Sequence, residues 1–275
     1  MAPRRPAVTA VVTAVRPAGS HDVVSLVVPA DPAWERARPG QLVVAPVAPG
    51  AGRVLPEVHW LAGAQGDRVH GTTIELLLPV ERETGVGERL RILGPLGRGF
   101  APPSQPVPSL LVAQDSGIVP LRWLVEVLRA RGCPTHVVLS LTERDRGIDL
   151  GHLRRHAATV VLTSPSALPE TLDSLLDDPR VDPAVVYAAA PVAVLRDTAA
   201  LARRRGCAVR VAALDPAPAP GPDDDFPVVC GTGLCGACDL AVRDGTTTRV
   251  VRPCLDGPVL PGEWLLGAAP GEVVP

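Results

Sequence analysis

Four cysteines near the end of the chain constrain its fold more than any other feature. They follow the spacing C-x4-C-x2-C-x15-C and are Cys230, Cys235, Cys238 and Cys254. Four thiolates brought together in this way, three from one loop and one from a distant position, suit the two irons of a [2Fe–2S] cluster. The intervening glycines support this interpretation, because glycine permits backbone at positive φ and lets N–H groups approach the sulfur atoms closely.

Two other uses of these cysteines stay open. Zinc sites usually combine two short C-x2–4-C pairs, whereas one pair here is stretched and the fourth cysteine is single. Disulfides are rare in cytosolic proteins, and the start Met1–Pro6 is not followed by the apolar run of a signal peptide. The spacing therefore favours a cluster over a zinc site and over disulfides. Cys133 and Cys207 are expected to be small buried apolar residues.

The composition is that of an ordinary globular protein. Hydrophobic residues make up 46% of the chain and charged residues 20%, and the net charge is −2. A charge this close to zero predicts no nucleic-acid partner. No uninterrupted apolar run reaches the length of about 18 residues that a transmembrane helix needs. We therefore expect a cytoplasmic protein with neither a nucleic-acid nor a membrane partner.

The first part of the chain reads as a β-barrel. Short segments rich in Val, Leu, Ile and Thr are separated by Gly and Pro, with no helical periodicity. These expected strands are Ala7–Val15, Asp22–Val28, Gln41–Ala45, Thr72–Val80 and Arg89–Leu93. Many short strands at close spacing predict an antiparallel barrel.

Strands and helices alternate in the second part of the chain. The expected strands are Ser109–Ala113, Val137–Leu141, Thr159–Thr163, Ala184–Ala188 and Ala208–Ala213. The expected helices between them are Val119–Arg131, Gly147–Arg155, Pro169–Leu176 and Val192–Arg205. This alternation predicts a doubly wound parallel sheet.

The cysteines belong to a third, smaller module. Asp244-Gly245 predicts a hairpin turn between strands Leu240–Val242 and Thr248–Val251, which would return the chain to Cys254. The expected division is a barrel at 1–103, an α/β domain at 104–214, a linker at 215–225 and the cysteine module at 226–275.

This order of modules, together with four short motifs, resembles one known family. The motifs are Arg38-Pro39-Gly40-Gln41, Gly94–Phe100, Gly117-Ile118-Val119-Pro120-Leu121 and the cysteine set followed by Asp256–Val259. They are similar to those of the electron-transfer subunit of heterodimeric bacterial dihydroorotate dehydrogenases. The resemblance implies a ferredoxin-reductase-like fold, with an antiparallel flavin-type barrel, a doubly wound parallel sheet and a small C-terminal [2Fe–2S] module.

The resemblance also implies cofactors and a partner. In that family the barrel binds FAD, the α/β domain docks NAD(H), and the cluster passes electrons to a separate flavin subunit that holds the orotate site. The chain would then be an oxidoreductase component in pyrimidine biosynthesis and part of a hetero-oligomer. We expect no catalytic residue here, because the carbon chemistry would lie in the partner, a dihydroorotate dehydrogenase catalytic subunit.

The flavin motif departs from the family pattern. The family's Arg-Pro-Leu-Ser stretch corresponds to 56–62, which contains a glutamate that would repel a pyrophosphate, and Arg53 lies three residues too early. The Gly-x-Gly-Thr loop corresponds to 81–84 and retains only Thr84. Trp60 offers a ring that could stack on a flavin, although a tryptophan on a barrel strand is more often a core residue. Arg53, Trp60 and Thr84 are the candidate FAD residues.

The nicotinamide motif departs further. Its glycine-rich turn corresponds to 113–120, where Gly117 is the one remaining glycine and Asp115 places a negative charge where phosphates would lie. The family's Cys-Gly-Pro is Ala-Ala-Pro here, so only Pro191 matches. Gly117, Pro120 and Pro191 are the candidate NAD(H) residues, but they also fit positions that simply end strands and begin helices.

Three functions are compatible with these residues. The first is an electron-transfer subunit that links a flavin or NAD(H) to a partner flavoprotein through the cluster. The second is a non-catalytic iron–sulfur partner protein that has lost FAD and NAD(H), and the third is a zinc-stapled interaction module. The sequence leaves FAD open and argues against NAD(H). Five histidines show no spacing with carboxylates that suggests a metal and are expected at surface or turn positions: His59, His70, His136, His152 and His156.

Overall fold

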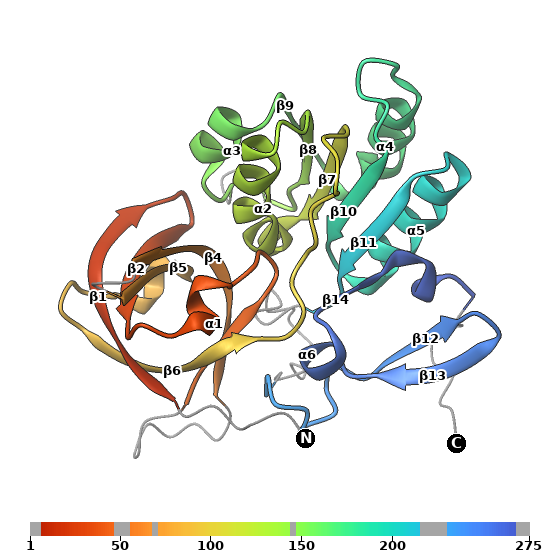
Figure 1. Cartoon of the computed structure of the whole chain (residues 1–275). Helices are drawn as coiled ribbons and strands as arrows, with labels where there is room; N and C mark the ends of the chain where they lie inside the picture. The colour runs from red at the N-terminus through yellow and green to blue at the C-terminus, as the bar shows by residue number, and fades with distance from the viewer. Residues whose placement is uncertain (1–6, 47–55, 68–70, 144–146, 215–229, 268–275) are drawn as a thin grey trace.

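The computed structural model describes residues 7–46, 56–67, 71–143, 147–214 and 230–267. The chain forms a barrel, an α/β domain and the cysteine module, which lie next to one another (Figure 1). Helix α2 (Ile118–Ala130) of the α/β domain faces the barrel. Among the described helices, none has the length and apolar composition needed to cross a membrane.

Six antiparallel strands close the barrel in the order β1-β2-β5-β4-β3-β6. Their bounds are β1 Val8–Pro17, β2 His21–Val28, β3 Leu42–Ala45, β4 Glu57–Asp67, β5 Gly71–Pro79 and β6 Arg89–Leu96. A short helix, α1 (Pro32–Glu35), inserts Trp34 into the barrel core at 2% exposure. The predicted barrel is confirmed, although the apolar pattern alone missed β4, whose Gly63 and Gly66 interrupt the strand signal.

The α/β domain contains a six-stranded sheet in the order β14-β11-β10-β7-β8-β9. Its strands are β7 Ser109–Gln114, β8 Thr135–Ser140, β9 Thr159–Thr163, β10 Val185–Ala189, β11 Ala208–Ala212 and β14 Val259–Pro261. The first five are parallel, as predicted. The strand order reverses between β7 and β10, so the carboxyl ends of these two strands form the crevice where doubly wound sheets bind ligands.

Helices cover both faces of this sheet. On the face toward the barrel, α2 and α3 (Leu150–His156) share a core with Trp60 and Phe100 of the barrel domain. On the other face, α4 (Leu168–Asp177) and α5 (Val192–Arg204) pack on a second core. The barrel and the α/β domain are therefore joined by a continuous apolar layer.

The cysteine module is also built into the α/β domain. Its hairpin consists of β12 (Leu240–Asp244) and β13 (Thr247–Val251), and Val242 and Val251 lie in the same core as α5. After the short helix α6 (Pro253–Asp256), β14 pairs antiparallel with β11 and adds the sixth strand. Because the C-terminal segment supplies a strand of the sheet, the orientation of the module is fixed.

Three of the motifs that carried the family resemblance meet in one joint between barrel and module. The Phe100 amide donates to the Pro39 carbonyl at 2.7 Å, and Gln41 Nε2 donates to the Gly97 carbonyl at 2.9 Å. The Val259 amide donates to the Arg98 carbonyl at 3.3 Å. The motifs are distant in sequence, but together they hold the C-terminal segment against the end of the barrel.

A buried charge network connects the two large domains. Arg122 of α2 is 3% exposed and donates to Asp149 Oδ2 at 2.7 Å, to Glu75 Oε2 at 2.9 Å and to the Ala62 carbonyl at 2.8 Å. Burial raises the pKa of Asp149, but hydrogen bonds from Arg16 and Arg122 outweigh it and leave that pKa below its usual value. The Asp149 carboxylate therefore stays charged, and the bonds from Arg122 to Ala62 and Glu75 fix α2 on strands β4 and β5.

Candidate metal centre and nucleotide sites

The loop from Cys230 to Cys238 is shaped by left-handed glycines. Gly231, Gly233 and Gly236 have φ angles of 66°, 77° and 70°. A Cβ at the first would meet Val44 and Val58 of the barrel, and one at the second would overlap the Leu255 side chain. Glycine is therefore required both by the backbone conformation and by the close packing of this loop.

Backbone amides of this loop point at the Cys230 sulfur. The amide of Leu234 lies 3.1 Å from Sγ, and those of Thr232 and Cys235 lie 3.4 Å from it. Burial raises the pKa of Cys230, but hydrogen bonds from Thr232 and from these amides lower it to about 6. The loop therefore stabilises a thiolate, which is the form that ligates metal.

The four cysteines lie in two close pairs. The Cys235 sulfur accepts the Cys230 amide at 3.4 Å, and Cys238 Sγ lies 3.4 Å from Cys254 Sγ. A hydrogen bond from the Cys254 thiol lowers the pKa of Cys238 to about 7, and the same interaction raises the pKa of Cys254. All four thiols are free, and a separation of 3.4 Å is well above the disulfide bond length of about 2.05 Å.

These residues fit a [2Fe–2S] cluster. Four thiols are provided, two of them buried (Cys230 and Cys254), and the amides directed at Cys230 would also favour the negative charge of a thiolate-bound cluster. The four cysteines singled out from their spacing are thus brought together.

Comparison with known proteins supports the same assignment. Residues 227–266 match the family model of the iron-sulfur cluster binding domain of dihydroorotate dehydrogenase B. Curated relatives named as the electron transfer subunit of dihydroorotate dehydrogenase B (NAD(+)) occur in Desulforamulus reducens and Geobacillus thermodenitrificans. The first is 26% identical over 64% of this chain and 64% of its own length, and the second 27% identical over 80% and 84%. The resemblance to this family is confirmed.

Solved structures support the fold class. The NADH-dependent reduced ferredoxin-NADP oxidoreductase superposes with a TM-score of 0.65 at 20% identity, covering 96% of this chain and 91% of that chain. The flavohem-like FAD/NAD binding domain of nitric oxide dioxygenase from Vibrio cholerae gives a TM-score of 0.56 at 15% identity, covering 75% of this chain and 98% of that chain. The ferredoxin-reductase-like architecture predicted from the sequence is therefore confirmed.

Two of the three candidate flavin residues, Trp60 and Thr84, lie in the described part of the barrel domain. Trp60 is 6% exposed in the apolar layer between the barrel and α2, and Arg53 lies outside the described residues. Thr84 Oγ1 is buried and has no hydrogen-bond partner among the residues that the structure describes. An orphaned hydroxyl of this kind is expected where a ligand supplies the missing partner.

The glutamate that argued against a pyrophosphate is Glu57, and it is not an isolated charge. It forms an ion pair with Arg82 of the short 3-10 helix at Val80–Arg82 and lies 3.4 Å from His59 Nε2. The hydrogen bond with His59 and the charge of Arg82 lower the pKa of Glu57 to about 2, although burial opposes them. The expected repulsion is therefore reduced. Arg82, which the sequence analysis missed, places a cation two residues before Thr84.

Two of the three candidate nicotinamide residues meet at the switch point of the sheet. Gly117 follows β7, and a Cβ on it would overlap the carbonyl oxygen of Ala189 at the end of β10. Pro191 is the exposed N-cap of α5, whereas Pro120 is buried in the first turn of α2. Gly117 and Pro191 are thus brought to one crevice, while Pro120 packs into the core.

Asp115 has a defined structural role at this crevice. It adopts a φ of 46°, and its carboxylate accepts hydrogen bonds from the Thr142 amide at 2.8 Å and hydroxyl at 2.7 Å. It therefore joins the ends of β7 and β8. Beside it, Gln114 Oε1 and Ser140 Oγ are buried and have no partner among the described residues. These two atoms could not be placed together from the sequence, because their proximity depends on the register of β7 with β8.

The expectation for the histidines is wrong at two positions. His136 on β8 is 7% exposed and His152 on α3 is 4% exposed, so both are buried in regular elements. Burial, followed by the charge of Arg122, lowers the pKa of His152 to about 4. His152 and His156 are four residues apart, so they lie on the same face of a helix. This spacing is the feature of the sequence that could have indicated a shared site on α3.

Proposed function

We propose that this chain is an electron-transfer subunit of the dihydroorotate dehydrogenase B type. It would pass electrons between a flavin and a partner catalytic flavoprotein through a [2Fe–2S] cluster held by Cys230, Cys235, Cys238 and Cys254. The observation that carries this proposal is the cysteine loop, in which three amides point at one of four gathered thiols. The names of the curated relatives support the same role.

When bound, the cluster would accept and release one electron at a time. The amides of Thr232, Leu234 and Cys235 would stabilise negative charge on the sulfur of Cys230 and so influence the reduction potential. Val44 and Val58 pack beneath Gly231 and shield the loop from water on the barrel side. The loop is therefore seated on the domain that we propose for the flavin.

We assign the flavin to the barrel. Thr84 supplies a buried hydroxyl with no partner among the described residues, and Arg82 supplies a cation two residues before it. Trp60 lies in the apolar layer between the barrel and α2. Arg53 remains a candidate because it lies three residues before the stretch that corresponds to the family's flavin motif. NAD(H) is not assigned, because Asp115 keeps a negative charge at the switch point.

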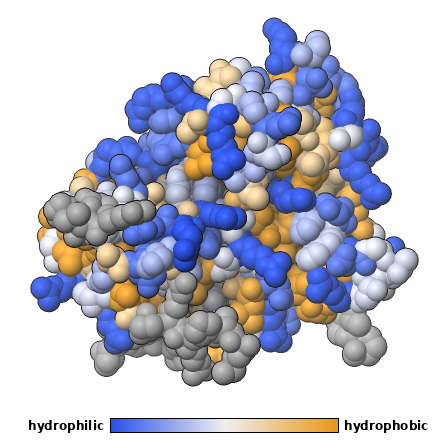
Figure 2. Space-filling model, viewed as in Figure 1, coloured by the Kyte–Doolittle hydropathy of each residue, from blue (hydrophilic) through white to orange (hydrophobic). Residues whose placement is uncertain are grey.

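The partner would dock over the cysteine loop, and the complex would act in the cytoplasm in pyrimidine biosynthesis. Leu234, between two ligands, is 88% exposed, and Leu255, next to Cys254, is 55% exposed. The surface in Figure 2 carries separate apolar patches rather than one continuous apolar face. Exposed leucines next to cluster ligands are suited to the apolar centre of a protein interface.

The test is electron transfer to the partner. The chain is reduced anaerobically, mixed with a dihydroorotate dehydrogenase catalytic subunit and orotate, and the recovery of cluster absorbance is followed. We expect reoxidation in wild type and a rate at least tenfold lower at subsaturating partner in Leu234→Asp. Leu162→Asp is the matched control, since Leu162 is 43% exposed on the distant strand β9. No reoxidation in wild type, or equal rates in both variants, contradicts the proposal.

A second candidate is the non-catalytic iron–sulfur partner protein. The charge of Asp115 and the altered flavin motif favour it. Released flavin separates the two, because about one equivalent per chain would reject the second candidate.

A further inference from the structure

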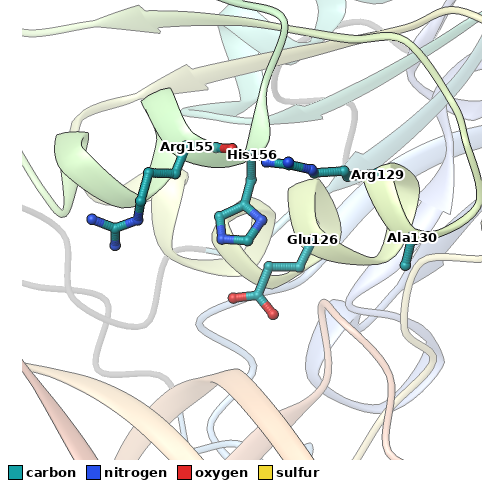
Figure 3. Close-up of a pocket in the computed structure, with 5 residues that line it drawn as sticks. All are labelled: Glu126, Arg129, Ala130, Arg155 and His156. Carbon is teal, nitrogen blue, oxygen red and sulfur yellow. Dashed lines mark hydrogen bonds between the residues drawn. The ribbon is translucent and has the colours of Figure 1, made fainter.

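Three side chains with metal-ligating atoms gather outside the cluster and nucleotide sites. Glu126 comes from α2, and His152 and His156 come from α3. One ligand atom of each lies within 4.8 Å of the ligand atoms of the other two. Figure 3 shows the carboxylate of Glu126 and the ring of His156 directed toward one another in a pocket between the two helices.

The local fold explains this gathering. Residues four apart lie on the same face of a helix, so His152 and His156 form one row, with ring centroids 4.5 Å apart. The Arg122 network fixes α2 against the loop that begins α3, through the bond from Arg122 to Asp149. The two histidine rings therefore face Glu126, and the Arg122 network fixes the positions of α2 and α3.

His152 provides a second, independent observation. Its side chain is 5% exposed, and Nε2 lies 3.1 Å from Glu126 Oε1, yet this nitrogen makes no hydrogen bond with any residue that the structure describes. A buried ring nitrogen of this kind is expected where a bound ion supplies the missing partner.

We infer that Glu126, His152 and His156 form a binding site for one divalent transition-metal ion of the zinc class. Zinc bonds of about 2.0–2.1 Å in a tetrahedron place neighbouring ligands about 3.4 Å apart, close to the separation between Glu126 and His152. Two imidazoles and one carboxylate suit zinc better than magnesium or calcium. Three protein ligands leave a fourth position open to the pocket.

The nearby arginines are directed elsewhere. Arg129 donates to the carbonyl of Arg155, and the Arg155 side chain extends away from Glu126 and His156 in Figure 3. Arg122 forms ion pairs with Asp149 and Glu75. Of the three candidate ligands, Glu126 is the one that supplies a carboxylate.

The test is a calorimetric zinc titration of the cluster-loaded full-length protein, with iron measured before and after. We expect about one equivalent of zinc in wild type and at least tenfold weaker binding in both His156→Ala and Glu126→Gln. These two positions are partly exposed, so the variants should fold, which circular dichroism checks. The control is His136→Ala, which removes a histidine that contacts Thr159 on the opposite side of β8 from this cluster's helices.

Three results would overturn the inference. They are the absence of a zinc isotherm in iron-loaded wild type, binding that neither variant weakens, and anomalous diffraction at the zinc edge that places the ion away from these three residues. None of these readouts depends on electron transfer, so the inference and the proposed function fail separately.

Discussion

The cysteine loop and the switch point of the α/β sheet differ in how completely each site is built. In the loop, three amides already point at Cys230, and the four cysteines lie in two close pairs. At the switch point, Asp115 occupies the turn and is hydrogen-bonded to Thr142, while Gln114 and Ser140 hold buried atoms without partners among the described residues. One chain thus carries a site preorganised for its metal and a crevice whose charge opposes a phosphate.

The difference teaches that local sites and assembled sites change in different ways. The cluster loop takes three ligands and its donors from nine consecutive residues, so its geometry depends on few positions. The switch point is assembled from the ends of β7, β8 and β10, and a single aspartate can alter its charge without altering the fold. A local site such as the cysteine loop binds its metal only when all of its parts are present. An assembled site such as the switch point can lose its ligand while the fold stays intact.

The largest expected effect comes from breaking the loop. Cys235→Ser should abolish the cluster absorbance, because serine replaces a thiolate ligand, while circular dichroism should show the barrel still folded. Cys133→Ala is the control, since Cys133 is buried beside α2 and contributes no ligand. Loss of iron in the control, or an intact cluster in Cys235→Ser, would overturn the ligand assignment.

Gly117→Ala tests how tightly the switch point is packed. The added Cβ would overlap the Ala189 carbonyl, and overpacking of this kind costs about 1–3 kcal/mol of unfolding free energy. Gly85→Ala is the control, because a Cβ there meets nothing within 4 Å. Urea denaturation measures both, and equal midpoints would show that the crevice is looser than the structure indicates.

Asp115→Asn tests the charge at the crevice and has the smallest expected effect. Asparagine tolerates the φ of 46°, its Oδ1 can still accept from the Thr142 amide, and its Nδ2 can donate to the Thr142 hydroxyl, so the charge is removed while both contacts can be kept. We expect NADH affinity to rise about tenfold, or about 1.4 kcal/mol, by fluorescence titration. Asp182→Asn, at another positive φ but beyond the amino end of β10, should leave affinity unchanged. An unchanged affinity in Asp115→Asn would show that charge does not limit binding there.

The sequence predicted the parts of the molecule that depend on local pattern. The barrel strands, the alternation of the α/β domain and the hairpin at Asp244-Gly245 follow from apolar periodicity and turn residues, and the four cysteines follow from spacing. It missed β4, where glycines break the pattern, and β14, where a short segment joins a sheet begun far earlier in the chain. The pairing of Glu57 with Arg82 and the orphaned atoms of Gln114 and Ser140 depend on strand register, which no local pattern specifies.

The most direct test of the central claim is the metal content of anaerobically purified protein. Iron, acid-labile sulfide, zinc and released flavin are quantified on one sample, together with its absorption spectrum. We predict about two irons and about two sulfides per chain, bound through the four cysteines, with flavin on the barrel. Zinc at the cysteines without labile sulfide would contradict this prediction and would make the C-terminal module a structural staple.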